Sequence, residues 1–568
     1  MDFVTISDHN CIDGALEIAH LEDTFISCEV TTYFPDDNAK FHLLVTGISE
    51  SQFAEIDKLR VDIRELRDYL VQENIVHSLA HPLFRVNSRV DVEHIEKVLL
   101  LFNRFEGING TRDPRAAELV RAVFRNLTPE MIDGMTEKHG IQPVGRTPWE
   151  KTFTGGSDDH GGLYIASAYT ETPHVENVED FINKIRNNEH EMGGKSGNSL
   201  ALSHSFYQIA RQYYGHVIKQ RSTSQNDFIS ELFKQLIEPP KKTRGNTFGE
   251  RVRTGVHDIY WRLKGFSPQA PERQLVEDFS SLMTGLKRPD AEQGHEWAFA
   301  ASCRISHQWA WIAVKKFNEK LRDGKLIEGL QNLASLGPVS LSVIPYVAAF
   351  ATQHKDEIFL RAVAERFDHA KTMVERSQRV ALIIEAEASI PGTKQKLEQM
   401  VAWFRSKALI PTLISCQENE PIVDMNVRNF PPVGKLNIFE NATTTAFPPF
   451  LEIIAYLEEK KFQELVVATP GPMGVLAVLA ARLLNIKCTI LAHAEFSEHV
   501  YEMTDDPNFE VLAQKYITWL YDQAERIYCL STEDESRLSS QAGKLCSIPP
   551  HSLQTTEKAA ESITQRLR

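Results

Sequence analysis

Histidine and carboxylate side chains recur at or just beyond short apolar runs between Met1 and Ile165. The members of this set are His9, Glu29, His42, His81, Asp158 and His160. Three or more imidazoles with carboxylates are the donors that borderline divalent metals prefer, and a bridging carboxylate lets two ions act on one phosphate. We therefore expect a hydrolytic site that holds more than one metal ion.

The apolar runs that must position these side chains alternate with amphipathic, helix-like stretches such as residues 51–73. In order, the runs read FVTIS, TFISCEV, FHLLVTGI, IVHSLAH, FEGING and FTGGSDDH. Such alternation is typical of β/α units around a parallel sheet or barrel, in which strand ends converge on one face. A single histidine at a strand end is commonly a hydrogen-bonded structural residue, so it is the shared context of the set that favours a site.

Six short motifs follow one another along these runs. They are ISDHNCIDG, SCEV, FHLLVTGI, AHP, FEGING and GGSDDH. Their order and content resemble the PHP family (polymerase and histidinol phosphatase), which contains metal-dependent phosphoesterases on a seven-stranded β/α barrel. The resemblance extends from Ile6 to His160 and implies a phosphoester small molecule as substrate.

The resemblance also implies roles for individual residues. The expected ligands of a divalent metal (Mn, Zn or Fe) are His9, Glu29, His42, His81, Asp158 and His160, of which Glu29, Asp158 and His160 are the expected catalytic residues. Glu29 would bridge two ions, and Asp8 would orient His9 rather than bind metal. Glu106 and Asn109 would line the same face and fix a ligand or loop, or would cap a strand end.

The sequence departs from this family at its beginning. The family carries an H-x-H pair on its first strand, and the chain starts at MDFVTISDHN without such a pair. Losing two imidazoles leaves at least one metal position with too few protein ligands. We therefore expect impaired catalysis. The motifs still indicate the reaction class, in which water attacks phosphorus and metal ions stabilise the developing charge.

A second set of motifs lies in residues 376–548. The run VALIIEA opens a series of buried strands and helices typical of a doubly wound, Rossmann-like domain. Within it, ATPGPMG places Gly471 and Gly474 at a strand-to-helix turn, where backbone can approach a ligand or a neighbouring helix. Alone, this turn is an ordinary feature of α/β domains.

The longer string from this turn through LAHAEFSEHV to YCLSTEDESRL resembles the N-terminal half of GT-B glycosyltransferases. The resemblance implies that Gly392, Gly471, Gly474 and His493 belong to a glycosyltransferase-like loop set and that a sugar or glycolipid is the acceptor. Glu495 stands where the family has Asp, and the family's donor-binding domain is not found in the sequence. We expect only weak sugar-nucleotide binding and no glycosyl transfer by this chain alone, unless a partner chain completes the GT-B fold.

Length and composition bound these interpretations. The chain has 568 residues, 42% of them hydrophobic, and carries 62 Lys and Arg against 77 Asp and Glu for a net charge of -15. These values predict several domains, namely 1–165 (PHP-like), 166–375 (mainly helical, of unknown role), 376–548 (GT-B-like half) and 549–568 (a polar tail). The acidic balance disfavours a broad nucleic-acid surface and a nuclease role.

The compartment follows from cysteine usage and from the chain's beginning. The seven cysteines include no C-x-x-C pair, and the N-terminus lacks the basic and apolar regions of a signal peptide. Both features favour a reducing, cytoplasmic location. The uncharged stretch from Leu333 to Thr352 contains Gly and Pro, so a buried hairpin or docking segment is favoured over membrane contact.

Two functions compete at this point. The first is an enzyme in which a phosphoesterase and a glycosyltransferase-like module serve sugar-phosphate or glycolipid metabolism. The alternative is a non-catalytic binding or scaffold protein that retains both folds. Metal content separates them, because a scaffold would retain almost no divalent metal.

Overall fold

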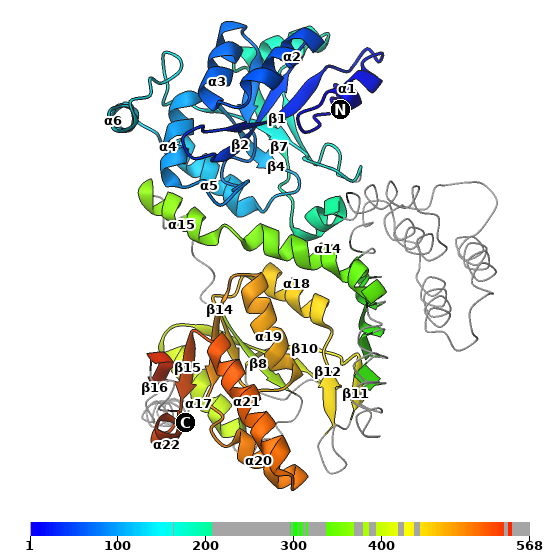
Figure 1. The fold of residues 1–568 in the computed structure, drawn as a ribbon, viewed down its shortest axis with the longest axis vertical. Helices are drawn as coiled ribbons and strands as arrows, with labels where there is room; N and C mark the ends of the chain where they lie inside the picture. The colour runs from blue at the N-terminus through cyan, green and yellow to red at the C-terminus, as the bar shows by residue number, and fades with distance from the viewer. Residues whose placement is uncertain are drawn as a thin grey trace, which may run out of the picture. The chain divides into compact units, whose positions relative to one another are not determined.

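The computed structural model describes two compact units. It describes residues 2–162, 164–206, 337–368, 379–385, 393–418, 425–436, 444–538 and 543–547, with residue 209 and short pieces between 296 and 315. The N-terminal unit contains Met1–Gln212 and Lys355–Glu375, and the C-terminal unit contains Tyr213–His354 and Arg376–Arg568 (Figure 1). The chain therefore returns to the N-terminal unit after a long intervening stretch.

The N-terminal unit alternates strands and helices (Figure 1). Its strands are β1 (Ser27–Tyr33), β2 (Lys40–Thr46), β3 (Val76–Leu79), β4 (Arg104–Asn109), β5 (Thr152–Gly156), β6 (Ala168–Glu171) and β7 (Glu191–Gly194). Its helices are α1 (Asp13–Ile18), α2 (Glu50–Leu59), α3 (Ile63–Gln72), α4 (Val92–Leu101), α5 (Pro114–Phe124), α6 (Pro129–His139), α7 (Val178–Arg186) and α15 (Glu357–Arg366). Side-chain caps begin several helices: Ser49 caps α2, Asp91 caps α4, and Thr128 followed by Pro129 begins α6.

Five strands form one mixed sheet in the order β1-β2-β3-β4-β5. The pairs β1–β2 and β2–β3 are antiparallel, and only β3–β4 and β4–β5 are parallel. The expectation of a wholly parallel sheet was therefore wrong. Between β1 and β2 the chain has room only for a tight turn, closed by a hydrogen bond from the Asn38 N–H to the Phe34 carbonyl, and a parallel connection would need a crossover.

Strand β2 shows how this sheet divides its faces. Phe41, Leu43 and Val45 are buried, and they alternate with residues that are only partly buried, including His42. The buried set joins a core built from the sheet and the helices packed on it. Most β2 side chains on the other face are polar.

Helix α15 completes the core of this unit from far along the chain. It packs against α4 and α5 (Figure 1), and Phe359, Leu360 and Val363 belong to the same core as the sheet. Arg366 donates to the buried carboxylate of Glu96 on α4 at 2.5 Å. Both apolar and charged contacts therefore fix this segment.

The C-terminal unit is a Rossmann-like α/β domain. Its main strands are β8 (Arg379–Glu385), β9 (Ile410–Cys416), β10 (Asn426–Phe430), β13 (Glu464–Val467), β14 (Lys487–Leu491), β15 (Arg526–Cys529) and β16 (Leu545–Ser547). Its helices are α14 (Gly337–His354), α17 (Thr393–Ser406), α18 (Phe450–Lys460), α19 (Pro472–Leu483), α20 (Phe496–Thr504), α21 (Pro507–Gln523) and α22 (Thr532–Arg537), and β11 (Gly434–Leu436) pairs with β12 (Thr445–Phe447).

The seven main strands are all parallel, in the order β10-β9-β8-β13-β14-β15-β16. Strand order therefore reverses between β8 and β13, and ligands of such sheets bind outside the carboxyl ends of the strands at that point. The expected α/β class is confirmed for both units. A closed barrel is not shown, because β1 and β5 are the edges of their sheet in the part of the N-terminal unit that the structure describes.

Three other expectations differ from the structure, wholly or in part. The run FVTIS is not a strand, since only Val4 forms an isolated bridge, with Thr24. The region expected to be mainly helical contains β6 and β7. The described part of the uncharged stretch, from Gly337 onward, lies in α14, which is one helix with Pro345 inside rather than a hairpin. Among the described residues, no helix combines the length and apolarity needed to cross a bilayer. The polar tail 549–568 lies outside the described residues.

Candidate metal centre

Glu29 is the centre of a polar cluster on the sheet of the N-terminal unit. It lies in β1 and is only 7% exposed. Its carboxylate is 2.7 Å from His42 Nδ1, 3.2 Å from His81 Nε2 and 3.7 Å from His9 Nδ1. Three imidazoles therefore face one buried carboxylate.

The strand register brings these side chains together. Glu29 pairs with Leu44 and Thr31 pairs with His42, so Glu29 and His42 are diagonal neighbours on the same face of the β1–β2 pair. His9 is added by an isolated parallel bridge with Glu29, in which the Asn10 N–H donates to the Glu29 carbonyl at 3.0 Å. The chain before α1 is thus held beside β1 by this single bridge.

Burial and hydrogen bonding oppose each other at the pKa of Glu29. Burial raises this pKa, but the hydrogen bonds from His42 and His81 and the charges of these residues lower it by more. The pKa of Glu29 therefore lies far below its usual range. Burial lowers the pKa of His42, against the effect of Glu29. Burial also lowers the pKa of His81, but the hydrogen bond and charge of Glu29 outweigh burial and raise it overall. Glu29 is therefore held as a carboxylate.

The donor set fits a divalent metal. One donor atom from each of His9, Glu29 and His42 lies within 4.8 Å of the others. Two imidazole nitrogens and a carboxylate oxygen are donors that zinc, manganese and iron accept. The lowered pKa of His42 keeps that imidazole in the neutral form that a ligand needs.

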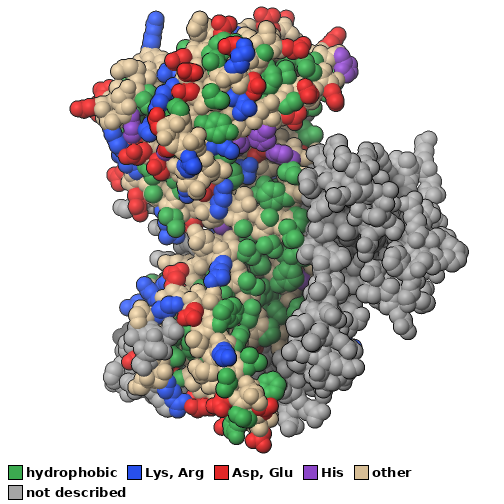
Figure 2. All heavy atoms as spheres, in the orientation of Figure 1, with side chains coloured by type: hydrophobic (Ala, Val, Ile, Leu, Met, Phe, Trp, Pro, Cys, Tyr) green, Lys and Arg blue, Asp and Glu red, His purple; other side chains and the backbone are tan. Residues whose placement is uncertain are grey.

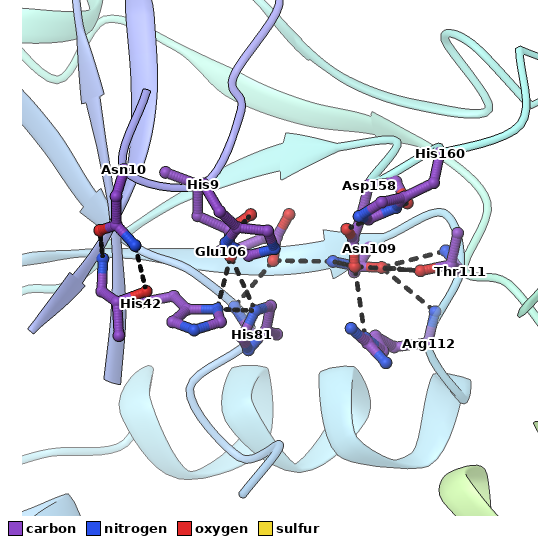
Figure 3. A network of polar contacts seen from close by, with 12 residues as sticks. His9, Asn10, His42, His81, Glu106, Asn109, Thr111, Arg112, Asp158 and His160 are labelled. Carbon is purple, nitrogen blue, oxygen red and sulfur yellow. Dashed lines mark hydrogen bonds and ion pairs between the residues drawn. The ribbon is translucent and has the colours of Figure 1, made fainter. Parts of the chain in front are cut away.

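A second polar group adjoins the first, around Asp158 in the loop after β5 (Figure 3). The Asp158 carboxylate accepts hydrogen bonds from Asn109 Nδ2 at 3.3 Å and from the Thr111 hydroxyl at 3.0 Å. It is also 3.3 Å from Arg112 Nε and 3.7 Å from His160 Nδ1. The rings of His9 and His160 are 6.2 Å apart, which places the two groups side by side.

Glu106 on β4 joins the two groups. Its Oε2 accepts the His81 backbone N–H at 2.8 Å and Asn109 Nδ2 at 3.0 Å. Residues three apart on a regular strand face opposite sides of the sheet, but a β-bulge between Glu106 and Ile108 turns both side chains to the same face. Burial raises the pKa of Glu106 to about 7, against the opposing effects of His81 and Asn109.

Two residues of this cluster have strained backbones. His81 has φ 29° and Asp158 has φ 47°, in the left-handed region where L-residues are disfavoured by roughly 1–2 kcal/mol. The hydrogen bond from the His81 N–H to Glu106 helps to hold one of these conformations. Strain of this kind clusters at functional sites.

All six residues predicted as ligands lie in or beside this cluster. Glu29 and His42 sit within antiparallel strands rather than at strand ends, whereas His81, Asp158 and His160 follow their strands as expected. The Asp8 carboxylate lies against Gly14, at the first turn of α1, and within the described residues it makes no hydrogen bond to the His9 ring. Figure 2 shows histidine side chains gathered on the surface of this unit.

Three contributors were not predicted from the sequence. Thr111 and Arg112 follow Asn109 directly, so polar residues just after a strand end were the available signal. Phe84 packs its ring at 85° to that of His81, with 5.4 Å between ring centroids. Nothing in its apolar context distinguished Phe84 from a core residue.

The residues predicted to form a glycosyltransferase-like loop have a different geometry. The first-turn N–H of Met473 at the start of α19 donates to the carboxylate of Glu385, at the end of β8, over 2.6 Å. A Cβ atom on Gly471 would lie 2.6 Å from that carboxylate, and one on Gly474 would lie 2.5 Å from the Thr469 carbonyl. Both glycines therefore serve close packing within the protein.

His493 also has internal partners. It is 4% exposed, its Nε2 is 2.8 Å from the Ala468 carbonyl, and its backbone N–H donates to the Tyr521 hydroxyl at 2.9 Å. These contacts tie the end of β14 to the end of β13 and to α21. Gly392, the remaining predicted member of the loop set, lies outside the described residues.

Comparison with protein-family models and with curated protein sequences finds no match for this chain.

Proposed function

We propose that the N-terminal unit is a metal-dependent phosphoesterase of the PHP type. The observation that carries this proposal is the buried Glu29 carboxylate facing three imidazoles, with Asp158 and His160 beside them. A buried carboxylate is costly unless charged or hydrogen-bonding groups compensate it, and this cluster supplies nitrogen donors of the kind that metals bind. The order of the six motifs along successive elements of the sheet also supports the PHP barrel as the parent fold.

A bound divalent ion would polarise a phosphoryl oxygen and make a water more acidic. The chain's own residues would hold and orient such an ion. Glu29 supplies negative charge, and His9 and His42 supply nitrogen donors. Glu106 fixes the backbone of His81, and Asn109 orients the carboxylate of Asp158.

For the C-terminal unit we infer a binding module of the GT-B type, with a sugar or glycolipid as its ligand. The strand order, which reverses between β8 and β13, supports a ligand crevice at the carboxyl ends of these strands. Glu385 already accepts the first N–H of α19, the position where a phosphate would bind in related architectures. A neutral ligand with hydroxyl donors suits this arrangement better than a nucleotide.

The phosphoesterase proposal is tested with the full-length chain. The purified protein is loaded with manganese, zinc or iron, and hydrolysis of p-nitrophenyl phosphate is followed before and after a chelator. Asp158→Asn removes the charge but tolerates the left-handed backbone, because Asn adopts positive φ readily. Asp133→Asn, on the exposed side of α6, is the matched control.

Hydrolysis should require metal, should disappear with the chelator, and should fall at least about tenfold in Asp158→Asn while Asp133→Asn keeps it. No hydrolysis with any metal, together with less than about a tenth of an equivalent of bound metal, would support the scaffold alternative instead.

A further inference from the structure

We infer that Lys355 and Arg112 form an anion subsite that makes the metal centre selective for a phosphomonoester dianion over a phosphodiester. This inference rests on the proposed phosphoesterase function and names the substrate class for it. Lys355 comes from the segment that returns to the N-terminal unit, far along the chain from the predicted site.

Both cations lie over the ring of Phe84. Lys355 Nζ is 3.9 Å from the ring centroid and Arg112 Cζ is 4.0 Å from it. The same ring packs against His81, and Arg112 is ion-paired with Asp158. Phe84 therefore links both cations to His81, and Arg112 also contacts the polar cluster directly through Asp158.

Much of the hydrogen-bonding capacity of these cations is unused in the described part of the chain. Lys355 Nζ donates to the Arg85 carbonyl at 2.6 Å, and its nearest carboxylate oxygen, on Asp356, is 3.9 Å away. An ammonium has three donors and a guanidinium has five. Arg112 Nε is buried without a hydrogen bond, although it lies 3.3 Å from Asp158. Burial and the neighbouring charges of Arg112 and Arg85 lower the pKa of Lys355, an effect that a bound anion would offset.

The segment that carries Lys355 is held in place. The Arg85 backbone N–H donates to Asp356 at 3.0 Å, and Arg115 Nη1 donates to Glu357 at 2.8 Å. Both carboxylates are about nine-tenths buried, with side-chain exposures of 11% and 10%. These contacts fix the backbone at Lys355 before any ligand binds. The Lys355 side chain itself is 38% exposed and accessible to a ligand.

The charge balance selects the substrate. If a metal takes the carboxylate of Asp158, Arg112 loses its ionic partner and needs another anion. A phosphomonoester carries about −1.5 to −2 charges at neutral pH and a diester carries one, so two further cations favour the monoester. Charge-assisted hydrogen bonds to a phosphate are among the strong ones.

The test replaces Lys355, because a change at Arg112 would also disturb Asp158. Lys355→Met is compared with Lys355→Arg, which keeps the charge, and with Lys97→Met as the matched control. Lys97 also lies over a phenylalanine, with its Nζ 5.5 Å from the Phe34 ring, but that ring packs against His94 on α4. Metal content and thermal denaturation are measured for every variant.

With p-nitrophenyl phosphate, Lys355→Met should raise KM about tenfold while kcat and metal content change little. With bis(p-nitrophenyl) phosphate the increase should be no more than about twofold, and Lys355→Arg should restore the monoester value. Equal KM changes for both esters, or none, would overturn the subsite while leaving the hydrolytic function in place.

Binding of inorganic phosphate to the metal-loaded chain, measured by calorimetry, keeps the two proposals separate. If the wild-type chain hydrolyses neither ester, the proposed function fails, but phosphate should still bind about tenfold more weakly to Lys355→Met than to Lys97→Met. Equal phosphate affinities would refute the subsite whatever the hydrolysis assays give.

Discussion

The two units treat the acidic side chains of their sheets in opposite ways. In the N-terminal unit, Glu29 faces three imidazoles from separate elements, and Asp158 lies beside Arg112. In the C-terminal unit, Glu385 accepts the first N–H of α19, and the glycine turn closes over it. The first arrangement offers several donors to a ligand. In the second, a carboxylate of the protein itself accepts the free backbone N–H at a helix N-terminus.

This difference shows that a residue's partners, more than its place beside a strand end, decide what it can do. A carboxylate at a helix N-terminus is a common means of stabilising that helix. Burying a carboxylate among imidazoles costs desolvation free energy, and this cost is offset only if a positive charge or a metal ion compensates the carboxylate. Changes on both sides can test this contrast.

The largest effect is expected from Glu29→Gln. The amide keeps the shape of the side chain but removes the charge that holds the imidazoles and a metal ion together, so zinc or manganese affinity should fall about 100-fold. Calorimetric titration and elemental analysis measure this, with circular dichroism to check the fold. Glu55→Gln, on the exposed side of α2, is the control, and equal metal affinity in the two variants would contradict the assignment of the centre.

The next effect is expected in the other unit, from Gly471→Ala. The new Cβ would lie 2.6 Å from the Glu385 carboxylate and displace it from the Met473 N–H, at a cost of about 2 kcal/mol in unfolding free energy. Thermal denaturation should show a lower Tm. In a Glu385→Ala background the cost should nearly vanish, since the clashing group is gone.

Gly134→Ala is the control for this change, because its Cβ would meet nothing within 4 Å and α6 should be stabilised slightly. A full cost of Gly471→Ala in the absence of the Glu385 side chain would show that the turn is not closed by that carboxylate.

Asn109→Ala should have a smaller effect on metal binding, roughly tenfold. Its amide donates to Glu106 and Asp158, so the substitution loosens both without removing a metal donor. Asn126→Ala, at an exposed helix end, gives the baseline in the same titration. If Asn109→Ala binds metal as the baseline does, the two polar groups act independently.

The last effect concerns the pH dependence of stability in the C-terminal unit. Burial raises the pKa of Glu385 to about 7, against backbone hydrogen bonds that lower it, whereas the unfolded value is about 4.3. Between these values the native state holds a proton that the unfolded state has lost, so stability falls as the pH rises from about 4.5 to 7.

Glu385→Gln should lack this decline, so it should be more stable than the wild type at pH 8 and differ little from it at pH 5. Urea unfolding at the two pH values measures the effect. A parallel pH dependence in the wild type and in the variant would mean that Glu385 does not titrate in this range.

The sequence indicated much of the candidate site because its chemistry sits in short local motifs. His81, Asp158 and His160 follow their strands as the apolar runs predicted, and Glu29 lies in the strand predicted around it. The sequence did not reveal that β1, β2 and β3 are antiparallel. Apolar alternation reports which residues are buried and carries little information about strand direction.

The α/β class of both units, the Rossmann-like character of the second and the residue types around Glu29 could all be predicted from the amino-acid order alone. Which of these residues meet depends on the three-dimensional fold. The bulge at Gly107 turns Glu106 and Asn109 to one face, and the return of the chain at Lys355 adds a cation to a site whose other members all precede Gly161. Hydrogen-bond register and long-range packing select such contacts, and neither leaves a periodic trace in the sequence.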